Sequence, residues 1–88
     1  MNVLKHNLGF TKKACSELTK LERDTELTVI ERLKELGDGV IKGKRLKGRF
    51  RGFLSLRVGK YRIIYEEPAY CEIIIIDIRH RESAYTHL

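Results

Sequence analysis

The sequence predicts an α+β domain: a helical hairpin packed on a mostly antiparallel sheet of about four strands, in the order strand, helix, helix, strand, strand, strand. Two patterns predict this class, and the length sets its limit. Apolar residues recur with helical spacing up to residue 36 and alternate with other residues from residue 53 onward. With 88 residues, of which 42% are hydrophobic, the chain is long enough for one globular domain over residues 1–88 and too short for two.

The first half of the chain predicts a short opening strand over residues 2–6, followed by two helices. The first helix begins at Thr11, because a threonine hydroxyl is a suitable N-cap. The second helix ends at residues 37–39, where two glycines stop it. The apolar residues that give these helices their periodicity are Phe10, Ala14, Leu18 and Leu21 in the first and Leu27, Val29, Ile30, Leu33 and Leu36 in the second. Because the connection at residues 22–24 is short, the helices are expected to be antiparallel.

The second half predicts three strands, over residues 53–58, 61–66 and 71–78. Gly59 and Lys60 form a tight turn between the first two strands. Pro68 marks the second turn, because a proline does not fit inside a central strand. Four consecutive isoleucines at residues 73–76 are apolar on both faces, which is typical of a strand at the centre of a sheet.

Several classes of function are excluded by composition. No run of about 18 apolar residues is present, so no membrane span is expected, and the first residues lack the pattern of an export signal. Cys15 and Cys71 are interpreted as small core residues of a protein in the reducing cytoplasm. The three histidines lie far apart and no metal-binding spacing occurs, so no metal is expected. No cofactor is expected either, because the glycines match no phosphate-binding loop.

The positive charge is concentrated in the middle of the chain. The net charge is +6, and residues 37–62 carry nine basic residues against Asp38 alone. Those residues are Lys42, Lys44, Arg45, Lys47, Arg49, Arg51, Arg57, Lys60 and Arg62. A solvated loop is one interpretation of such a run. The density of positive charge nevertheless favours a polyanionic partner, with nucleic acid the leading candidate. The residues expected to bind RNA are Lys47, Arg49, Arg51, Arg57 and Lys60.

Arginine and tyrosine are the remaining candidates for chemistry. Arg57 and Arg62 flank a tight hairpin, and Arg79, Arg81 and Tyr85 would share one face if the last strand stays extended. These side chains are therefore expected to meet across the sheet. Guanidinium groups can hold a scissile phosphate and stabilise its transition state, and a ribose 2′-hydroxyl can supply the nucleophile. Tyr85 is a candidate for proton transfer, and His80 is its rival. The pattern alone favours the alternative that Tyr85 is an aromatic residue of the tail packed on the sheet. The same residues also suit nucleic-acid binding without chemistry.

At these residues the sequence resembles the RelE/ParE toxin superfamily of prokaryotic toxin–antitoxin systems. The resemblance is carried by LKG at residues 46–48, LRVGKYRIIY at residues 56–65, the isoleucine strand and IRHRESAY at residues 78–85. A terminal tyrosine shortly after an arginine pair resembles the RelE branch. That branch implies a metal-independent endoribonuclease that cleaves messenger RNA in the ribosomal A site. It also implies a cognate RelB-like antitoxin as partner, with operator DNA contacted only through the toxin–antitoxin complex.

Carried over by position, the resemblance makes Arg62, Arg79 and Tyr85 catalytic residues and Arg81 a further basic residue of the site. The sequence departs from RelE proteins at Phe53 and Ser55, where that branch often has lysines. The general base is therefore Tyr85, His80 or a residue not yet placed. Two alternatives follow from the same patterns: a ParE-like toxin that inhibits DNA gyrase by binding, and a nucleic-acid-binding module without catalysis.

Overall fold

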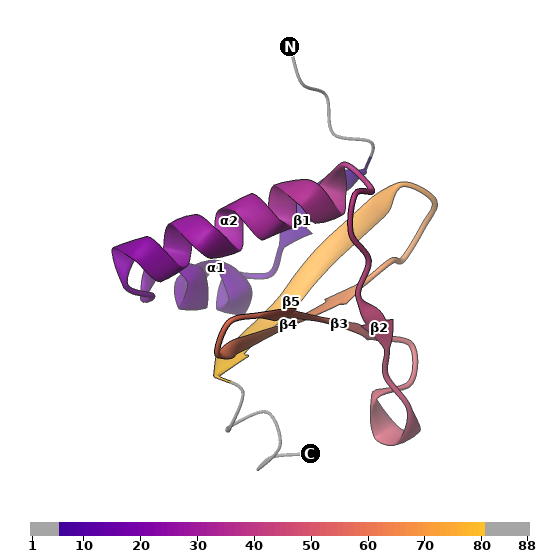
Figure 1. Cartoon of the computed structure of the whole chain (residues 1–88). Helices are drawn as coiled ribbons and strands as arrows, with labels where there is room; N and C mark the ends of the chain where they lie inside the picture. The colour runs from indigo at the N-terminus through magenta and orange to yellow at the C-terminus, as the bar shows by residue number, and fades with distance from the viewer. Residues whose placement is uncertain (1–5, 81–88) are drawn as a thin grey trace.

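The computed structural model describes residues 6–80 of the chain (Figure 1). Two helices and a five-stranded sheet make up one α+β fold, which confirms the predicted class. The elements are β1 (Asn7–Phe10), α1 (Lys12–Thr19), α2 (Arg23–Gly37), β2 (Lys44–Arg45), the 3₁₀ turn η1 (Gly48–Phe50), β3 (Leu54–Val58), β4 (Tyr61–Glu66) and β5 (Glu72–His80).

The strands lie in the order β1-β5-β4-β3-β2. β1 pairs with β5 in parallel, and the other neighbours are antiparallel. The isoleucine strand therefore lies inside the sheet with a partner on each side, as predicted. The sheet has five strands instead of about four because residues 44–45 add a short edge strand. The opening strand covers residues 7–10, and the part of the predicted strand at residues 2–5 lies outside the described residues.

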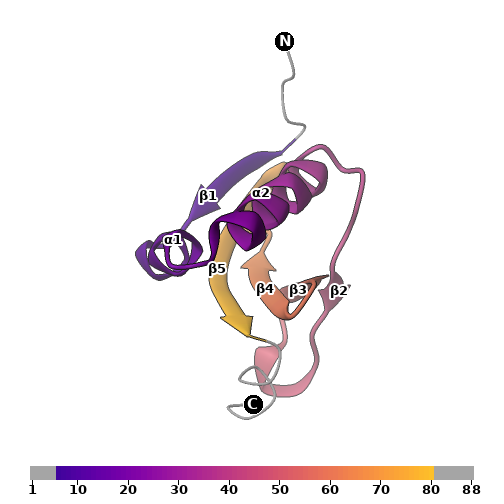
Figure 2. The same cartoon turned by 60° about the vertical axis from the view of Figure 1, so that its left-hand side comes forward.

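The hydrophobic core lies between α2 and one face of the sheet (Figure 2). α2 contributes Val29, Leu33 and Leu36, all at most 3% exposed. The sheet contributes alternate residues of β3 and β4, as period-two side-chain alternation requires, and three isoleucines of β5, where the alternation shifts by one residue after Ile75. These are Leu54, Leu56 and Val58 from β3, Ile63 and Tyr65 from β4, and Ile73, Ile75 and Ile78 from β5. None of the helices described is both long and apolar enough to cross a membrane.

α1 covers the outer edge of β5 beyond the point where β1 ends. Thr11 caps α1, since its hydroxyl accepts a hydrogen bond from the Ala14 N–H at 3.1 Å. The same hydroxyl donates to the Ile76 carbonyl at 3.1 Å, and the Thr11 N–H donates to the Ile75 carbonyl at 3.0 Å. The predicted N-cap is therefore confirmed, and it also ties the helix to the central strand.

Three sequence-based assignments need correction. Phe10 belongs to β1 instead of the first helix and is 41% exposed. Leu27 is 48% exposed, because it precedes Val29 by two residues and therefore lies on the opposite side of α2 from the buried stripe. Cys15 is exposed on α1, where Ala14 is the buried residue, and Cys71 is half-buried in the turn before β5. The prediction that both cysteines are core residues is wrong.

Candidate functional site

Three arginines form a row across the sheet on the face opposite to α2. Arg57 on β3 pairs with Arg62 on β4, and Arg62 pairs with Arg79 on β5. Directly opposed residues on antiparallel strands share a face. This face is not the core face, because the neighbours of Arg62 and Arg79 in sequence, Ile63 and Ile78, are buried against α2. The predicted meeting of these arginines across the sheet is what the register shows.

A β-bulge in β5 directs Arg79 to this open face. The register shifts between β4 and β5: Ile64 opposes Asp77, whereas the next residue, Tyr65, opposes Ile75. Ile76 is therefore the extra residue, and the alternation of buried and open positions reverses after it. Without the bulge, a strand that buries Ile75 would also turn Arg79 toward the core. Bulges commonly redirect side chains in this way.

A cavity of about 200 Å³ adjoins the arginine row. Its floor is apolar and comes from the open face of the sheet, while one wall comes from the segment around η1, which lies away from α2 in both views (Figures 1 and 2). Its lining residues are Leu46, Lys47, Phe50, Phe53, Ile64, Ile76, Asp77, Arg62 and Arg79. The cavity thus combines an apolar floor with cationic groups, an arrangement that suits a ligand with flat apolar parts and negative charge.

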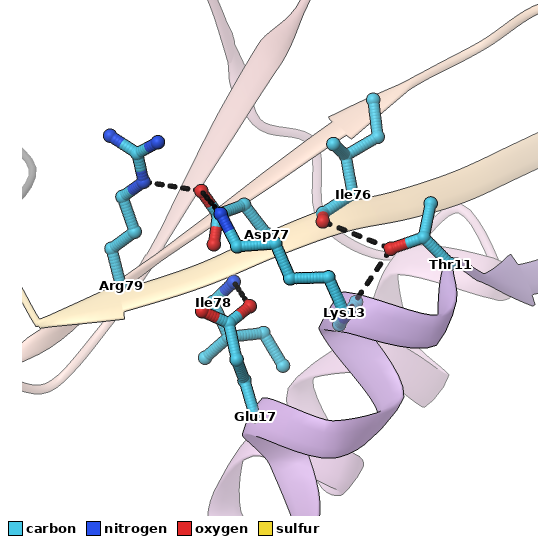
Figure 3. A network of polar contacts seen from close by, with 8 residues as sticks. Thr11, Lys13, Glu17, Ile76, Asp77, Ile78 and Arg79 are labelled. Atoms are coloured by element: carbon cyan, nitrogen blue, oxygen red, sulfur yellow. Dashed lines mark hydrogen bonds and ion pairs between the residues drawn. The ribbon is translucent and has the colours of Figure 1, made fainter.

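Polar contacts order this open face. Arg62 Nη1 donates to Ser55 Oγ at 3.1 Å, so the guanidinium is tied to β3. Arg79 Nε contacts Asp77 Oδ2, and Lys13 Nζ of α1 reaches the same oxygen at 3.3 Å (Figure 3). Burial raises the pKa of Asp77, but its bonds to Glu17 and Arg79 and the nearby cations outweigh burial and lower the pKa below 3.8.

Glu17 supports the same network from α1. Its Oε1 accepts a hydrogen bond from the Ile78 N–H at 3.0 Å, at the edge of β5 that β1 leaves unpaired (Figure 3). Burial raises the pKa of Glu17 above 4.5; the Ile78 N–H lowers it, and the neighbouring Asp77 adds to the rise.

The basic segment between α2 and β3, residues 38–53, is anchored to the sheet by Tyr65. The Gly43 N–H donates to Tyr65 Oη at 2.9 Å. Gly43 has no room for a side chain, since a Cβ would lie 2.7 Å from both the Ser55 carbonyl oxygen and Tyr65 Oη. Burial raises the pKa of Tyr65 above 10.0, although the Gly43 N–H opposes this rise. Each residue predicted to bind RNA, from Lys47 to Lys60, has an exposed side chain.

Comparison with known proteins identifies the family. Residues 8–85 match the family model described as the ParE toxin of type II toxin–antitoxin systems, parDE. The chain belongs to this toxin family. No curated protein sequence matches the toxin.

Solved structures similar to the toxin include both RelE and ParE systems. A chain of the RelBE2 toxin–antitoxin complex from Mycobacterium tuberculosis is 25% identical, with a TM-score of 0.75, and the match covers 91% of the toxin and 95% of that chain. An E. coli RelE mutant in the free state is 18% identical, with a TM-score of 0.73 and coverage of 97% and 92%. A chain of the Pseudomonas aeruginosa ParDE system is 18% identical, with a TM-score of 0.63 and coverage of 86% and 96%. The suspected membership of the RelE/ParE superfamily is confirmed.

The structure separates His80, a predicted catalytic residue, from Arg62 and Arg79. His80 follows Arg79 on β5 and therefore lies on the opposite face, beside Tyr61, with the two ring centroids 5.5 Å apart. Together with the start of α2, these rings line a different and more open pocket. Arg81 and Tyr85, the other predicted catalytic residues, lie outside the described residues.

Sequence reasoning missed two parts of this candidate site. Asp77 was not singled out, although a single acidic residue after four isoleucines is an unusual choice for a buried strand. The apolar walls formed by Leu46, Phe50 and Phe53 were also missed, because they come from an irregular segment whose position depends on the Gly43 contact. Within residues 6–80, no group of three or more His, Cys, Asp or Glu side chains is arranged to hold a metal ion.

Proposed function

We propose that this toxin is a ribosome-dependent endoribonuclease that cleaves messenger RNA in the ribosomal A site. The observation that carries the proposal is the direct pairing of Arg62 with Arg79 on the open face, beside an apolar cavity. Two guanidinium groups on neighbouring strands suit a phosphodiester, which gains negative charge in its transition state. The similarity in fold to RelE supports the same reading.

In this mechanism the arginines bind the scissile phosphate, and the ribose 2′-hydroxyl of the RNA is the nucleophile. The ribosome and the arginines hold the RNA in line for attack, so positioning supplies much of the rate. Tyr85 is proposed to transfer a proton, because it matches by position the catalytic tyrosine of the RelE branch that the sequence resembles. His80 is left out of the mechanism, because it lies across the sheet from the arginine row.

A RelB-like antitoxin is proposed to neutralise the toxin in the cytoplasm. Several similar structures are toxin–antitoxin complexes, including RelBE from E. coli and YoeB-YefM from Staphylococcus aureus. The exposed basic residues between positions 42 and 62 suit an acidic antitoxin segment that folds as it binds. Operator DNA would then be contacted through the antitoxin complex and not by the toxin alone.

Primer extension on a messenger RNA in translating ribosomes tests the proposal. Wild type is expected to cut at A-site codons, whereas Tyr85→Phe and Arg62→Ala should each lose most of the cuts. Arg32→Ala is the matched control, since Arg32 lies on α2 and bonds only to Glu35 among the contacts seen. Thermal unfolding shows that each variant is folded. Absence of cuts with folded wild-type protein would refute the proposal.

The second candidate is inhibition of DNA gyrase by binding. It is favoured by the family model itself, which is that of ParE toxins, and by the likeness to the ParDE system. This function predicts growth arrest with a DNA-damage response, uncut messenger RNA and unchanged toxicity of Tyr85→Phe. Primer extension, combined with growth of cells that express wild type or Tyr85→Phe, therefore separates the two candidates.

A further inference from the structure

A buried carboxylate lies within the arginine site. Asp77 is 4% exposed and lines the same cavity as Arg62 and Arg79. A carboxylate is costly to bury unless it is paired. Asp77 follows four isoleucines on the central strand, where another isoleucine would extend the apolar floor of the cavity. The carboxylate is therefore stabilised in this position by the groups that contact it, and these contacts indicate its role.

The contact with Asp77 fixes one edge of the Arg79 guanidinium. Asp77 Oδ2 receives the Nε–H of Arg79, and the two terminal nitrogens of Arg79 point away from the carboxylate (Figure 3). A guanidinium held through Nε keeps its terminal N–H groups available for a phosphate. The side chain of Arg79 is 28% exposed, so part of it remains open to solvent.

The carboxylate also offsets repulsion within the arginine row. Arg62 lies directly opposite Arg79 and next to Arg57, so three cations share one line across the sheet. Like charges opposed on neighbouring strands destabilise a sheet. Asp77 adds a negative charge on the same face, two residues before Arg79 on β5, and compensates part of this repulsion.

The backbone on either side of this contact is held by α1. Glu17 accepts the N–H of Ile78, the residue between Asp77 and Arg79, and Lys13 contacts Asp77 itself at 3.3 Å. Lys13 is 62% exposed, so its contact is screened by solvent and is the weaker of the two that Asp77 makes with cations.

We propose that Asp77 is a positioning residue, which acts through Arg79 by holding its guanidinium so that the terminal nitrogens face the substrate phosphate. This inference rests on the proposed nuclease function for its substrate, but the Asp77–Arg79 contact can be tested without that function. Asp77→Asn keeps the size of the side chain and removes the charge. Asp24→Asn makes the same change in charge at an exposed residue of α2 and serves as the control.

The first measurement follows the Nε–H of Arg79 by NMR, with its signal assigned from Arg79→Lys. In wild type and in Asp24→Asn, a single slowly exchanging Nε–H signal is expected. In Asp77→Asn, this signal should move toward the free arginine position and exchange at least ten-fold faster. An unchanged signal in Asp77→Asn would overturn the proposal.

The second measurement separates positioning from binding and folding. Asp77→Asn is expected to lower the maximal rate of messenger RNA cleavage at least ten-fold. The toxin concentration for half-maximal rate should stay the same or fall, because the variant loses a negative charge that repels the RNA phosphates. In an Arg79→Ala background, Asp77→Asn should cause no further loss, whereas a purely structural role would lower the rate in both backgrounds and overturn the proposal. If wild type makes no cuts, the proposed function fails and the NMR comparison alone decides the role of Asp77.

Discussion

The hydroxyl of Tyr65 is predicted to hold the basic segment against the sheet, and Tyr65→Phe tests this. The Gly43 N–H donates to this hydroxyl at 2.9 Å, and Tyr65 itself is 2% exposed. The substitution keeps the ring and leaves the Gly43 N–H without its acceptor. An unsatisfied buried donor costs about 1–3 kcal/mol. For a domain of this size, each 1 kcal/mol lowers Tm by roughly 4–8 °C. A loss of about 2 kcal/mol therefore corresponds to a fall of roughly 8–16 °C.

Thermal unfolding followed by circular dichroism measures this loss, and amide exchange at Gly43 locates it. The matched control is Tyr70→Phe. Because Tyr70 is 94% exposed, this variant should unfold at the same temperature as wild type. Gly43→Ala should cost at least as much, because its Cβ would lie 2.7 Å from Tyr65 Oη. Both changes break the same contact, so their effects should not add in the double variant. If Tyr65→Phe behaves like Tyr70→Phe, water replaces the hydroxyl and the anchoring argument is wrong.

Three further predictions concern the helices and the core. Thr11→Ala should lower the free energy of unfolding, measured in urea, by about 1 kcal/mol or more, because it removes an N-cap and a hydrogen bond to β5. Thr11→Ser keeps the hydroxyl and should retain most of the wild-type stability. Glu17→Gln should have the same stability as wild type below pH 4.5 and should be the more stable protein at higher pH. The reason is that the raised pKa of Glu17 makes its ionisation unfavourable in the folded state. Measurement of Tm for both proteins at pH 4 and pH 7.5 tests this. Ile63→Ala, at a residue with 0% exposure, should cost about 2–5 kcal/mol in urea unfolding, and an intact Tm would contradict the packing described.

Elements whose signals are local could be predicted from the sequence. The strand over residues 61–66 was predicted with its observed bounds, because a glycine turn before it and a proline turn after it delimit an apolar and aromatic run. Thr11 was predicted as an N-cap because its hydroxyl stands directly before residues with helical spacing, which is also a local signal. β1 was displaced, since a four-residue strand is defined by its partner β5, which lies more than 60 residues later. β2 has two residues and gave no periodic signal at all.

For the candidate site, the sequence analysis predicted that the arginines lie together, but it did not identify the carboxylate of Asp77. Arg57 and Arg62 flank one turn, so their pairing follows from the hairpin alone. The side of the sheet that Arg79 takes depends on the bulge at Ile76, and strict alternation from Ile75 would have turned it into the core. Placing His80 needed the same information. A single extra residue in one strand thus decides which titratable groups share a face. No periodic pattern in the sequence indicates where that extra residue lies.

The position of β5 also bears on when the toxin becomes able to act during its synthesis. β5 follows the other strands of the sheet in the chain, yet it separates β1 from β4. A nascent chain that ends before residue 72 therefore leaves β1 without a partner and Arg62 without Arg79. Long-range pairings of this kind also form slowly. Incomplete chains consequently lack the paired arginines. Under the proposed function, the site that an antitoxin would cover is therefore assembled only after the last strand has been translated and has paired.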